Sequence, residues 1–437
     1  MAAVATRRFS WLGLGCVAVI AGSALPQSLS LIGDVGGLFG TAYGLTALAK
    51  TAGLAGLLAM AALNRFILTP RIGHEAGRRA LVLSIAVETA LGAAVVAAAV
   101  GLASLPPGAH EQAVWPFALQ PDLSRIGEAY YAKELWRGAA ILVVALGMVV
   151  SLLWRRTRLF GPIIGAALLF WLPLPNFALL AKPAWPTSFQ RSETGFAAAA
   201  ILRGEALTKE LCTADCFRPR DDPSDPSPYG LWQRGDGDLY GWLTDVFDRI
   251  GHSPFPYGTI AKLDPRERWQ LIDYFRARVA GSVARNAGNW PYPVLTPDFP
   301  VTCRDGRSSM RDILGQSGRP IEIAIPGRDG AAPPPAPQDI VLTRILLASA
   351  QDDAVPTGVD CVSTSPDAPA ALALIAGVDQ RGLAGGRLLA DANGWLRSRL
   401  LPLPSDDEKR TLTAWAAEIS RVAAAPFEAG GIGTHRH

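Results

Sequence analysis

Two ionisable residues interrupt the long apolar runs near the start of this sequence. Lys50 lies in the run 44–64, and Glu88 lies in the run 80–104. A charge at membrane depth costs a few kcal/mol, so such residues usually have a function or a partner. Lys50 is close enough to one end of its run to extend its ammonium group to the membrane surface. Glu88 is near the middle of its run and must be protonated or paired, with Lys50 and Arg65 as candidates, so both a structural ion pair and a transport-related acid are open.

Four of the five cysteines lie beyond residue 200. In an oxidising compartment they can form two disulfides. Cys212 and Cys216 are four residues apart, which places them on one face of a helix end and favours a local disulfide. Cys303 and Cys361 are the expected second pair, within the last part of the chain.

Several classes of function find no support in the sequence. The charge is almost balanced, with 41 basic and 38 acidic residues, so nothing indicates a nucleic-acid partner. The sequence has no glycine-rich phosphate loop, no Gly-x-Ser-x-Gly and no His-x-x-x-His. Without a nucleophile and base in any known spacing, we expect the protein not to be an enzyme. Its hydrophobic fraction of 49% instead indicates a membrane protein.

The membrane part is predicted from segments of about 20 apolar residues, the length that a helix needs to cross a hydrocarbon core of roughly 30 Å. A signal peptide with Arg7 and Arg8 as its basic start is the alternative for the first segment. We favour a membrane helix there because further spans follow at once. Pro173 and Pro175 should break or kink the last segment. The five predicted spans are 9–26, 44–64, 80–104, 138–154 and 159–181.

Basic residues predict the orientation of these spans. Arginines cluster in the turn 65–79 and again at 155–158. Short loops rich in Lys and Arg stay in the cytoplasm. With a cytoplasmic N-terminus, five crossings place both clusters inside and the chain from residue 183 onward outside.

Beyond residue 190 the composition becomes that of a soluble protein, beginning with helical patterns. Helices are expected at 196–211 and 238–250. Asp264-Pro265-Arg266-Glu267 has the residues of a helix start, an N-cap acid followed by Pro and then Glu at the third position. Gly281 is the expected end of that helix.

The last part of the chain mixes strand and helix patterns. Strands are predicted at 320–325 and 339–347, and Asn393-Gly394 predicts a hairpin over 386–400. A final helix follows a capping box at residues 405–408. Its expected buried face consists of Leu412, Trp415, Ile419 and Val422.

The two central apolar runs resemble the copper-resistance D family of bacterial inner-membrane proteins over residues 40–115. The resemblance implies a role in copper uptake or copper homeostasis, with the outer side being the periplasm. It rests on Lys50, Asn64-Arg65-Phe66, Glu88, Pro106-Pro107 and His110.

Copper is therefore the expected ion, and Cu(I) prefers sulfur and imidazole ligands. His110 is the best single candidate ligand because the family carries it, whereas a surface histidine without a role is the alternative. Missing ligands would come from a partner, such as a periplasmic copper-binding protein. The membrane part offers Cys16, Met60, His74, His110 and Met148, without paired spacing.

Residues 201–212, 236–244 and 263–281 resemble the opening, middle and closing helices of a c-type cytochrome domain. That family attaches haem through Cys-x-x-Cys-His. Here Cys212 and Cys216 are one residue too far apart and Phe217 replaces the histidine, while Phe255-Pro256 stands where the distal methionine is expected. The resemblance therefore implies the fold without haem c.

The C-terminal part resembles a thioredoxin-like domain. Residues 296–314 are similar to its entry strand, and residues 387–400 to its late hairpin. No Cys-x-x-Cys is present, so the resemblance implies the fold and no thiol chemistry.

The predicted fold class is a membrane all-α part with about five transmembrane helices (1–186), a periplasmic all-α cytochrome-c-like domain (187–286) and an α/β thioredoxin-like domain (287–437). We expect a multi-pass protein of the bacterial inner membrane, in contact with the lipid bilayer, that acts in copper transport or homeostasis. The alternatives are a membrane-anchored electron carrier and a scaffold or assembly factor for periplasmic partners.

Overall fold

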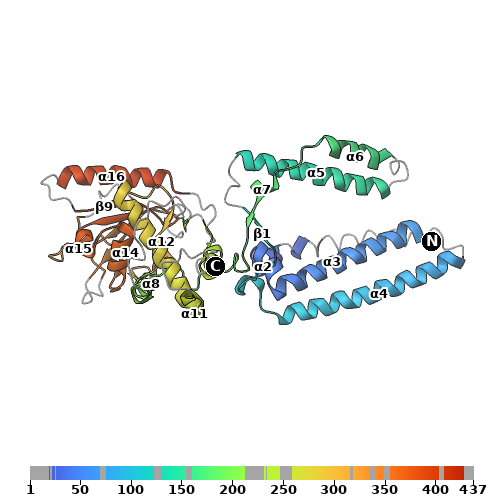
Figure 1. Ribbon diagram of the computed structural model, residues 1–437, viewed down its shortest axis with the longest axis horizontal. Helices are drawn as coiled ribbons and strands as arrows, with labels where there is room; N and C mark the ends of the chain where they lie inside the picture. Colours follow the sequence, from blue (N-terminus) through green and yellow to red (C-terminus); the bar gives the residue numbers. More distant parts are fainter. Residues whose placement is uncertain are drawn as a thin grey trace. The chain divides into compact units, whose positions relative to one another are not determined.

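The computed structural model (Figure 1) divides the chain into two compact units. The hairpin unit comprises Met1–Ala118 and Ala184–Arg191, and the sheet unit comprises Leu119–Pro183 and Ser192–His437. The structure describes residues 19, 22–24, 26–68, 75–122, 129–153, 160–211, 231–232, 234–246, 258–314, 318–334, 341–348, 355–402 and 408–427.

The hairpin unit is built from two long apolar helices. The short helix α2 (Val35–Gly40) leads into α3 (Ala42–Leu63), which continues as a π-helical turn (Asn64–Leu68). Helix α4 (Glu75–Ser104) returns beside α3 and is followed by a 3-10 turn (Gly108–His110) (Figure 1). The predicted spans 44–64 and 80–104 are thereby confirmed as helices.

Side-chain caps fix where the first two helices begin. Asp34 accepts a hydrogen bond from the backbone N–H of Gly37, and Thr41 accepts one from Gly44. Each of these satisfies a donor that the first helical turn leaves without a partner. The predicted span 9–26 lies mostly outside the described residues.

A second pair of apolar helices belongs to the sheet unit. Helix α5 (Ala129–Leu153) packs beside α6 (Phe160–Trp171), and the short α7 (Phe177–Leu180) follows. Strands β1 (Leu119–Pro121) and β2 (Ala181–Pro183) pair antiparallel where the chain enters and leaves this helical pair. Helix α5 begins at Ala129, nine residues before the predicted start at 138. The prediction missed its first turns because they contain polar residues and so lack the apolar pattern of a membrane span.

The predicted last span, 159–181, is not one helix. Helix α6 ends at Trp171, immediately before the segment with Pro173 and Pro175. Among the described residues, three helices are long and apolar enough to cross a membrane: Ala42–Leu63, Glu75–His110 and Ala129–Ser151. The predicted count of five is therefore not confirmed.

The rest of the sheet unit is an α/β fold around a seven-stranded mixed sheet in the order β3-β9-β8-β5-β6-β7-β4. Strands β5, β6 and β7 are parallel to one another, and the other pairings are antiparallel. The strands are β3 (Val294–Leu295), β4 (Thr302–Cys303), β5 (Ile321–Ala324), β6 (Thr343–Leu347), β7 (Cys361–Ser363), β8 (Arg387–Ala390) and β9 (Trp395–Leu400). The predicted strand at 320–325 and the hairpin over 386–400 are confirmed. The predicted strand at 339–347 is confirmed from Thr343 to Leu347, and residues 339–340 lie outside the described part.

Helices cover both faces of this sheet. Leu388 packs in the core with α8 (Ala198–Leu211), α12 (Pro265–Ala287) and α14 (Ala368–Ala376). Its neighbour Leu389 packs instead against Trp415, Ile419 and Val422 of α16 (Glu408–Ala424). Because successive strand residues point to opposite faces, α16 lies on the other side of the sheet from α12 and α14. The predicted buried face of the final helix is confirmed in these three residues.

The remaining elements of the sheet unit are short. They are α10 (Asp236–Gly241), a π-helical turn (Trp242–Val246), α11 (Thr259–Lys262), α13 (Met310–Ile313) and α15 (Gln380–Leu383). The predicted helix 238–250 corresponds to α10 and the turn after it, and its last residues lie outside the described part.

The predicted helix start at residue 264 is correct, but the predicted end is wrong. Asp264 accepts from the backbone of Glu267, whose side chain accepts in return from the backbone of Asp264. The helix passes through Gly281 and ends at Gly288, which has left-handed backbone angles. A Cβ on Gly281 would lie 2.0 Å from the carbonyl oxygen of Leu374 in α14. Gly281 therefore permits close helix packing and does not end the helix.

The region with the cytochrome-c-like patterns shares its core with the sheet. Ile201 of α8 and Ala277, Ala280 and Ala284 of α12 are buried with Ile323 of β5. Nothing in this arrangement supports a separate cytochrome-c-like domain. The predicted boundaries at 186/187 and 286/287 stay predictions.

Candidate functional site

The helices α3 and α4 approach each other closely at two glycines. A Cβ on Gly53 would lie 2.6 Å from Val95 Cγ2, and one on Gly56 would lie 3.2 Å from Leu91 Cδ2. Small residues at membrane helix contacts let the two backbones come close. Van der Waals packing then holds the helices together, because in lipid there is no hydrophobic driving force between them. This packing fixes the register between the helices and so determines which polar residues meet.

Three polar residues meet at the C-terminal end of α3. The Asn64 side chain donates from Nδ2 to Glu88 Oε2 at 2.9 Å. Ser84 donates from Oγ to Asn64 Oδ1 at 2.6 Å. The result is a chain of hydrogen bonds, Ser84 to Asn64 to Glu88, between two helices that are otherwise apolar. An ionisable group placed this way inside a membrane helix pair is a functional-site candidate.

The expected pairing of Glu88 with Lys50 is not seen. The contacts at Gly53 and Gly56 place Lys50 level with about residue 98 of α4, which is ~15 Å along the helix from Glu88. Glu88 is instead hydrogen-bonded to an amide. The side chain of Arg65, the other expected partner, lies outside the described side chains.

Asn64 is the residue that sequence reasoning missed as a partner of Glu88. It is the C-cap of α3 and the first residue of the π-helical turn, and its backbone N–H bonds to the carbonyls of both Met60 and Ala61. Single π-helical turns inside α-helices occur frequently at functional sites. The sequence did contain a signal for this pairing, because an amide ends one apolar run and an acid lies within the next.

His110 lies in the turn after α4 and is exposed. The neighbouring carbonyl of Ala109 accepts a hydrogen bond from Arg191 at 3.4 Å, and Arg191 also pairs with Asp34 at 3.4 Å. This pair holds the histidine turn beside the start of α2 within the hairpin unit. Among the described residues, His110 belongs to no group of three or more His, Cys, Asp or Glu side chains that could hold a metal ion.

Met148 is a further candidate sulfur ligand of the membrane part. Met148 of α5 lies against Gly165 of α6, where it fills the helix contact. Among the described residues, no group of three or more His, Cys, Asp or Glu side chains could hold a metal ion. Cys16, His74, Cys212 and Cys216 lie outside the described residues, so the proposed local disulfide and the altered haem motif stay predictions.

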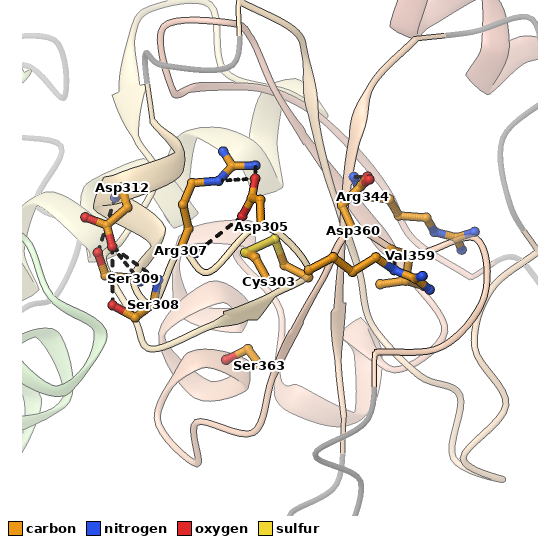
Figure 2. The surroundings of a disulfide bond; sticks show 12 residues. Cys303, Asp305, Arg307, Ser308, Ser309, Asp312, Arg344, Val359, Asp360 and Ser363 are labelled. Atoms are coloured by element: carbon orange, nitrogen blue, oxygen red, sulfur yellow. Dashed lines mark hydrogen bonds and ion pairs between the residues drawn. A yellow bond between two sulfur atoms is a disulfide. The ribbon is translucent and has the colours of Figure 1, made fainter.

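The expected disulfide between Cys303 and Cys361 is confirmed (Figure 2). The two cysteines are register partners on the adjacent antiparallel strands β4 and β7, and β4 is the last strand at one edge of the sheet. Arg304 adds hydrogen bonds to the carbonyls of Val355, Pro356 and Val359. The disulfide and this arginine together hold the short edge strand on the sheet.

Buried acids in the sheet unit have close cationic or hydroxyl partners. Glu322 of β5 lies 3.2 Å from Arg344 and 3.1 Å from Arg387, and it accepts from the indole nitrogen of Trp415 at 2.8 Å. All three charged residues are buried. These contacts connect three central strands to α16, and we therefore assign the four residues a structural role.

Asp273 of α12 is a different case. Burial raises the pKa of its carboxyl to about 8, and the hydrogen bond from Thr194 Oγ1 at 2.5 Å opposes that rise. The nearby Arg276 ion-pairs with Asp236. Asp273 is therefore held mostly in its protonated form at neutral pH.

Comparison with known proteins identifies the N-terminal region. Residues 3–102 match the family described as Copper resistance protein D. Two of the three long apolar helices lie wholly or mostly in the matched residues, and the resemblance read from residues 40–115 is supported as far as residue 102. Pro106-Pro107 and His110 lie beyond the match.

The remaining comparisons add little. No curated protein matches the chain. One solved structure, described as a study of a disulfide switch in BsSco, a member of the Sco family of cytochrome c oxidase assembly proteins, has 10% sequence identity and a TM-score of 0.22. The match covers 31% of this chain and 97% of that chain. A similarity this low assigns no fold, and no comparison supports a cytochrome-c-like domain.

Proposed function

We propose that this protein moves copper, or helps to balance it, across the bacterial inner membrane. The observation that carries the proposal is the match of residues 3–102 to the copper resistance family. The hydrogen-bonded Glu88 within that region adds a polar group of the kind that membrane transport sites use. Copper is the cargo in this proposal, and a periplasmic copper-binding protein supplies ligands that the chain lacks.

The proposed orientation places the N-terminus in the cytoplasm and the sheet unit in the periplasm, with up to five crossings. The Cys303–Cys361 disulfide supports it, because disulfides persist in oxidising compartments. Alkaline phosphatase fused after residue 402 should be active and a green fluorescent protein fused there should be dark. The reverse result would invert the topology.

For the soluble region we propose non-catalytic domains near the predicted boundaries, with the α/β part in a thioredoxin-like fold. The hairpin from β8 to β9 and the helix α16 after it support that fold. This region would position a copper-carrying partner and perform no chemistry itself.

Copper flux into proteoliposomes tests the transport proposal. Liposomes containing the purified full-length protein and a copper-sensitive fluorescent chelator should accumulate Cu(I) faster than protein-free liposomes. Deleting the protein in cells should change copper content and copper tolerance. Flux equal to that of protein-free liposomes, together with unchanged cellular copper, would overturn the proposal.

A second candidate is a scaffold for periplasmic partners. It is favoured by the closed core and disulfide of the sheet unit, whose described residues include no metal-binding group. The two candidates differ in their dependence on the membrane acid. A scaffold should rescue a deletion strain equally well with Glu88→Gln, whereas a transporter should not.

A further inference from the structure

We propose that Glu88 binds a proton reversibly and that rotation of the Asn64 carboxamide transmits this protonation to the α3–α4 hairpin. This proposal rests on the proposed function in one respect, namely that the proton would be coupled to copper movement. The proton-binding site itself is argued from the hairpin alone.

The present hydrogen bonds match an ionised Glu88. Ser84 donates to Asn64 Oδ1, and Asn64 Nδ2 donates to Glu88 Oε2. Both bonds point toward the carboxylate, which can only accept when it is ionised. The arrangement is therefore complete without a proton on Glu88.

The same three residues also match a protonated Glu88. A proton from water that binds Oε2 turns the carboxylate into a neutral acid with one O–H donor. If the Asn64 amide rotates by half a turn, its oxygen accepts from Glu88 and its nitrogen donates to the Ser84 hydroxyl, which can also accept. Both states then contain two hydrogen bonds. The donor and acceptor exchange roles in both hydrogen bonds, and loss of the proton restores the first state.

Among the side chains that the structure describes on α3 and α4, no cation lies next to Glu88. The charged groups with described side chains on the packed helices are Lys50 on α3 and Glu75, Arg78 and Arg79 at the start of α4. Lys50 and Arg79, the nearest of them, are each ~14–15 Å from Glu88 along the helices. Glu75 and Arg79 pair with each other at 2.7 Å. Cu(I) prefers sulfur and imidazole ligands over a carboxylate, and the printed partner of Glu88 is an amide. The proton is thus a better occupant than copper.

The position of Asn64 gives the rotation a structural consequence. The residue joins α3 to the π-helical turn Asn64–Leu68, where the backbone changes its hydrogen-bonding pattern. The contacts at Gly53 and Gly56 hold the opposite part of the hairpin. A change in the Asn64 hydrogen bonds therefore acts on the end of α3, where the helix geometry already deviates.

Infrared difference spectroscopy tests the proton site without any copper. The full-length protein is titrated over about pH 4 to 9, a range that brackets an ordinary and a raised carboxyl pKa. All variants carry Asp273→Asn, because Asp273 is another carboxyl that titrates in this range. Other carboxyls also titrate in this range, so each spectral change is compared with that of Glu88→Gln. On raising the pH, the background should lose a carboxylic C=O component that Glu88→Gln does not have. Glu75→Gln, which removes an acid at the other end of α4, should retain that component.

Asn64→Leu separates the relay from the acid. Leucine has a similar volume and neither donates nor accepts, so the C=O band of Glu88 should persist at a shifted frequency. An unchanged frequency would overturn the role of Asn64. A pH titration of Glu88→Gln identical to that of the background would overturn the proton site.

Copper flux under an imposed pH gradient tests the coupling. Reversing the gradient should change wild-type and Glu75→Gln flux by about tenfold. A tenfold change corresponds to about 1.4 kcal/mol, which is less than the free energy needed to place a charged carboxylate at membrane depth. Glu88→Gln flux should be equal in both directions of the gradient. Wild-type flux that ignores the gradient would overturn the coupling while leaving the proposed function intact. Flux at the protein-free level at every pH would instead overturn the proposed function, and the infrared titration would still decide the proton site.

Discussion

Glu88 in the hairpin unit and Glu322 in the sheet unit are both acids in apolar surroundings, but their partners differ. Glu322 is held between two guanidinium groups and an indole N–H, so its charge is compensated in one fixed arrangement. Glu88 has a neutral amide as its partner. A compensated acid cross-links a fold, whereas an acid beside a neutral and reversible donor can change its charge without losing its hydrogen bonds. On the proposal made for Glu88, the partner, more than the depth of burial, separates a structural acid from one that exchanges a proton.

The largest expected effect comes from removing the compensated acid. Glu322→Ala leaves Arg344 and Arg387 buried without their carboxylate and should destabilise the sheet unit by about 3–5 kcal/mol. Urea unfolding of the full-length protein in detergent, followed by tryptophan fluorescence, measures this. Glu210→Ala is the matched control, because Glu210 pairs with the exposed Arg203 and should contribute less than about 1 kcal/mol. Equal effects of the two variants would remove the contrast drawn above.

The disulfide should have the next largest effect. Replacing both Cys303 and Cys361 by alanine opens a loop with a sequence separation of 58 residues. The loss should be about 2–4 kcal/mol in the same unfolding assay, because the unfolded chain gains conformational freedom. Cys16→Ala is the control and should have no comparable effect. An unchanged midpoint in the double variant would mean that the other contacts of β4 suffice.

Asp273 allows the pH dependence to be tested in the sheet unit. Its folded pKa of about 8 lies above the ordinary value of 3.8, so the folded state holds the proton more tightly. This contribution is complete below pH 4, falls by up to about 1.4 kcal/mol per pH unit as the unfolded chain ionises, and levels off above pH 8. Asp273→Asn should flatten the loss of stability between pH 5 and 8 in urea unfolding. An identical pH profile in wild type and variant would contradict the assignment.

A smaller effect is expected at the start of α12. Asp264→Ala removes the N-cap and should destabilise the sheet unit by about 1 kcal/mol, whereas Asp264→Ser should retain most of the stability because serine also caps. Urea midpoints of the two variants measure the difference. Alanine and serine variants with equal stability would show that the capping box is not needed.

The smallest expected effect on stability is that of Glu88→Gln. Glutamine keeps an acceptor for Asn64, so thermal unfolding in detergent should change by less than about 1 kcal/mol. Copper flux should nevertheless be strongly reduced. A stability loss as large as that of Glu322→Ala would make Glu88 a structural acid and would end the contrast.

Local features were predictable from the sequence where their signal is local. The capping box at Asp264, the Asn393-Gly394 hairpin, the buried face of α16 and the two long membrane helices were predicted correctly. Contacts between distant elements were not. Gly281 has the residue type of a helix end, and only the approach of α14 shows that it serves packing.

The candidate site was predictable as one residue and not as an arrangement. Glu88 was identified by its position in an apolar run, but Asn64 became its partner through the helix register that Gly53 and Gly56 set. The partners of Glu322 depend likewise on strand register, since Glu322 and Arg344 are opposite each other on the parallel strands β5 and β6. Periodicity indicates which face a residue occupies, and it does not indicate which residue it meets.

The ribbon of β1 and β2 has a consequence for biosynthesis. Gln120 of β1 donates to both carboxylate oxygens of Asp238 at 2.7 and 2.9 Å, and Lys182 of β2 lies 3.3 Å from the same carboxylate. Asp238 follows Gln120 by 118 residues. At about 5–20 residues per second, a ribosome needs roughly 6–24 s to reach it. The helices α5 and α6 lie between Gln120 and Lys182 in the sequence, so they are synthesised before Asp238 and this clamp can form only after both helices are complete.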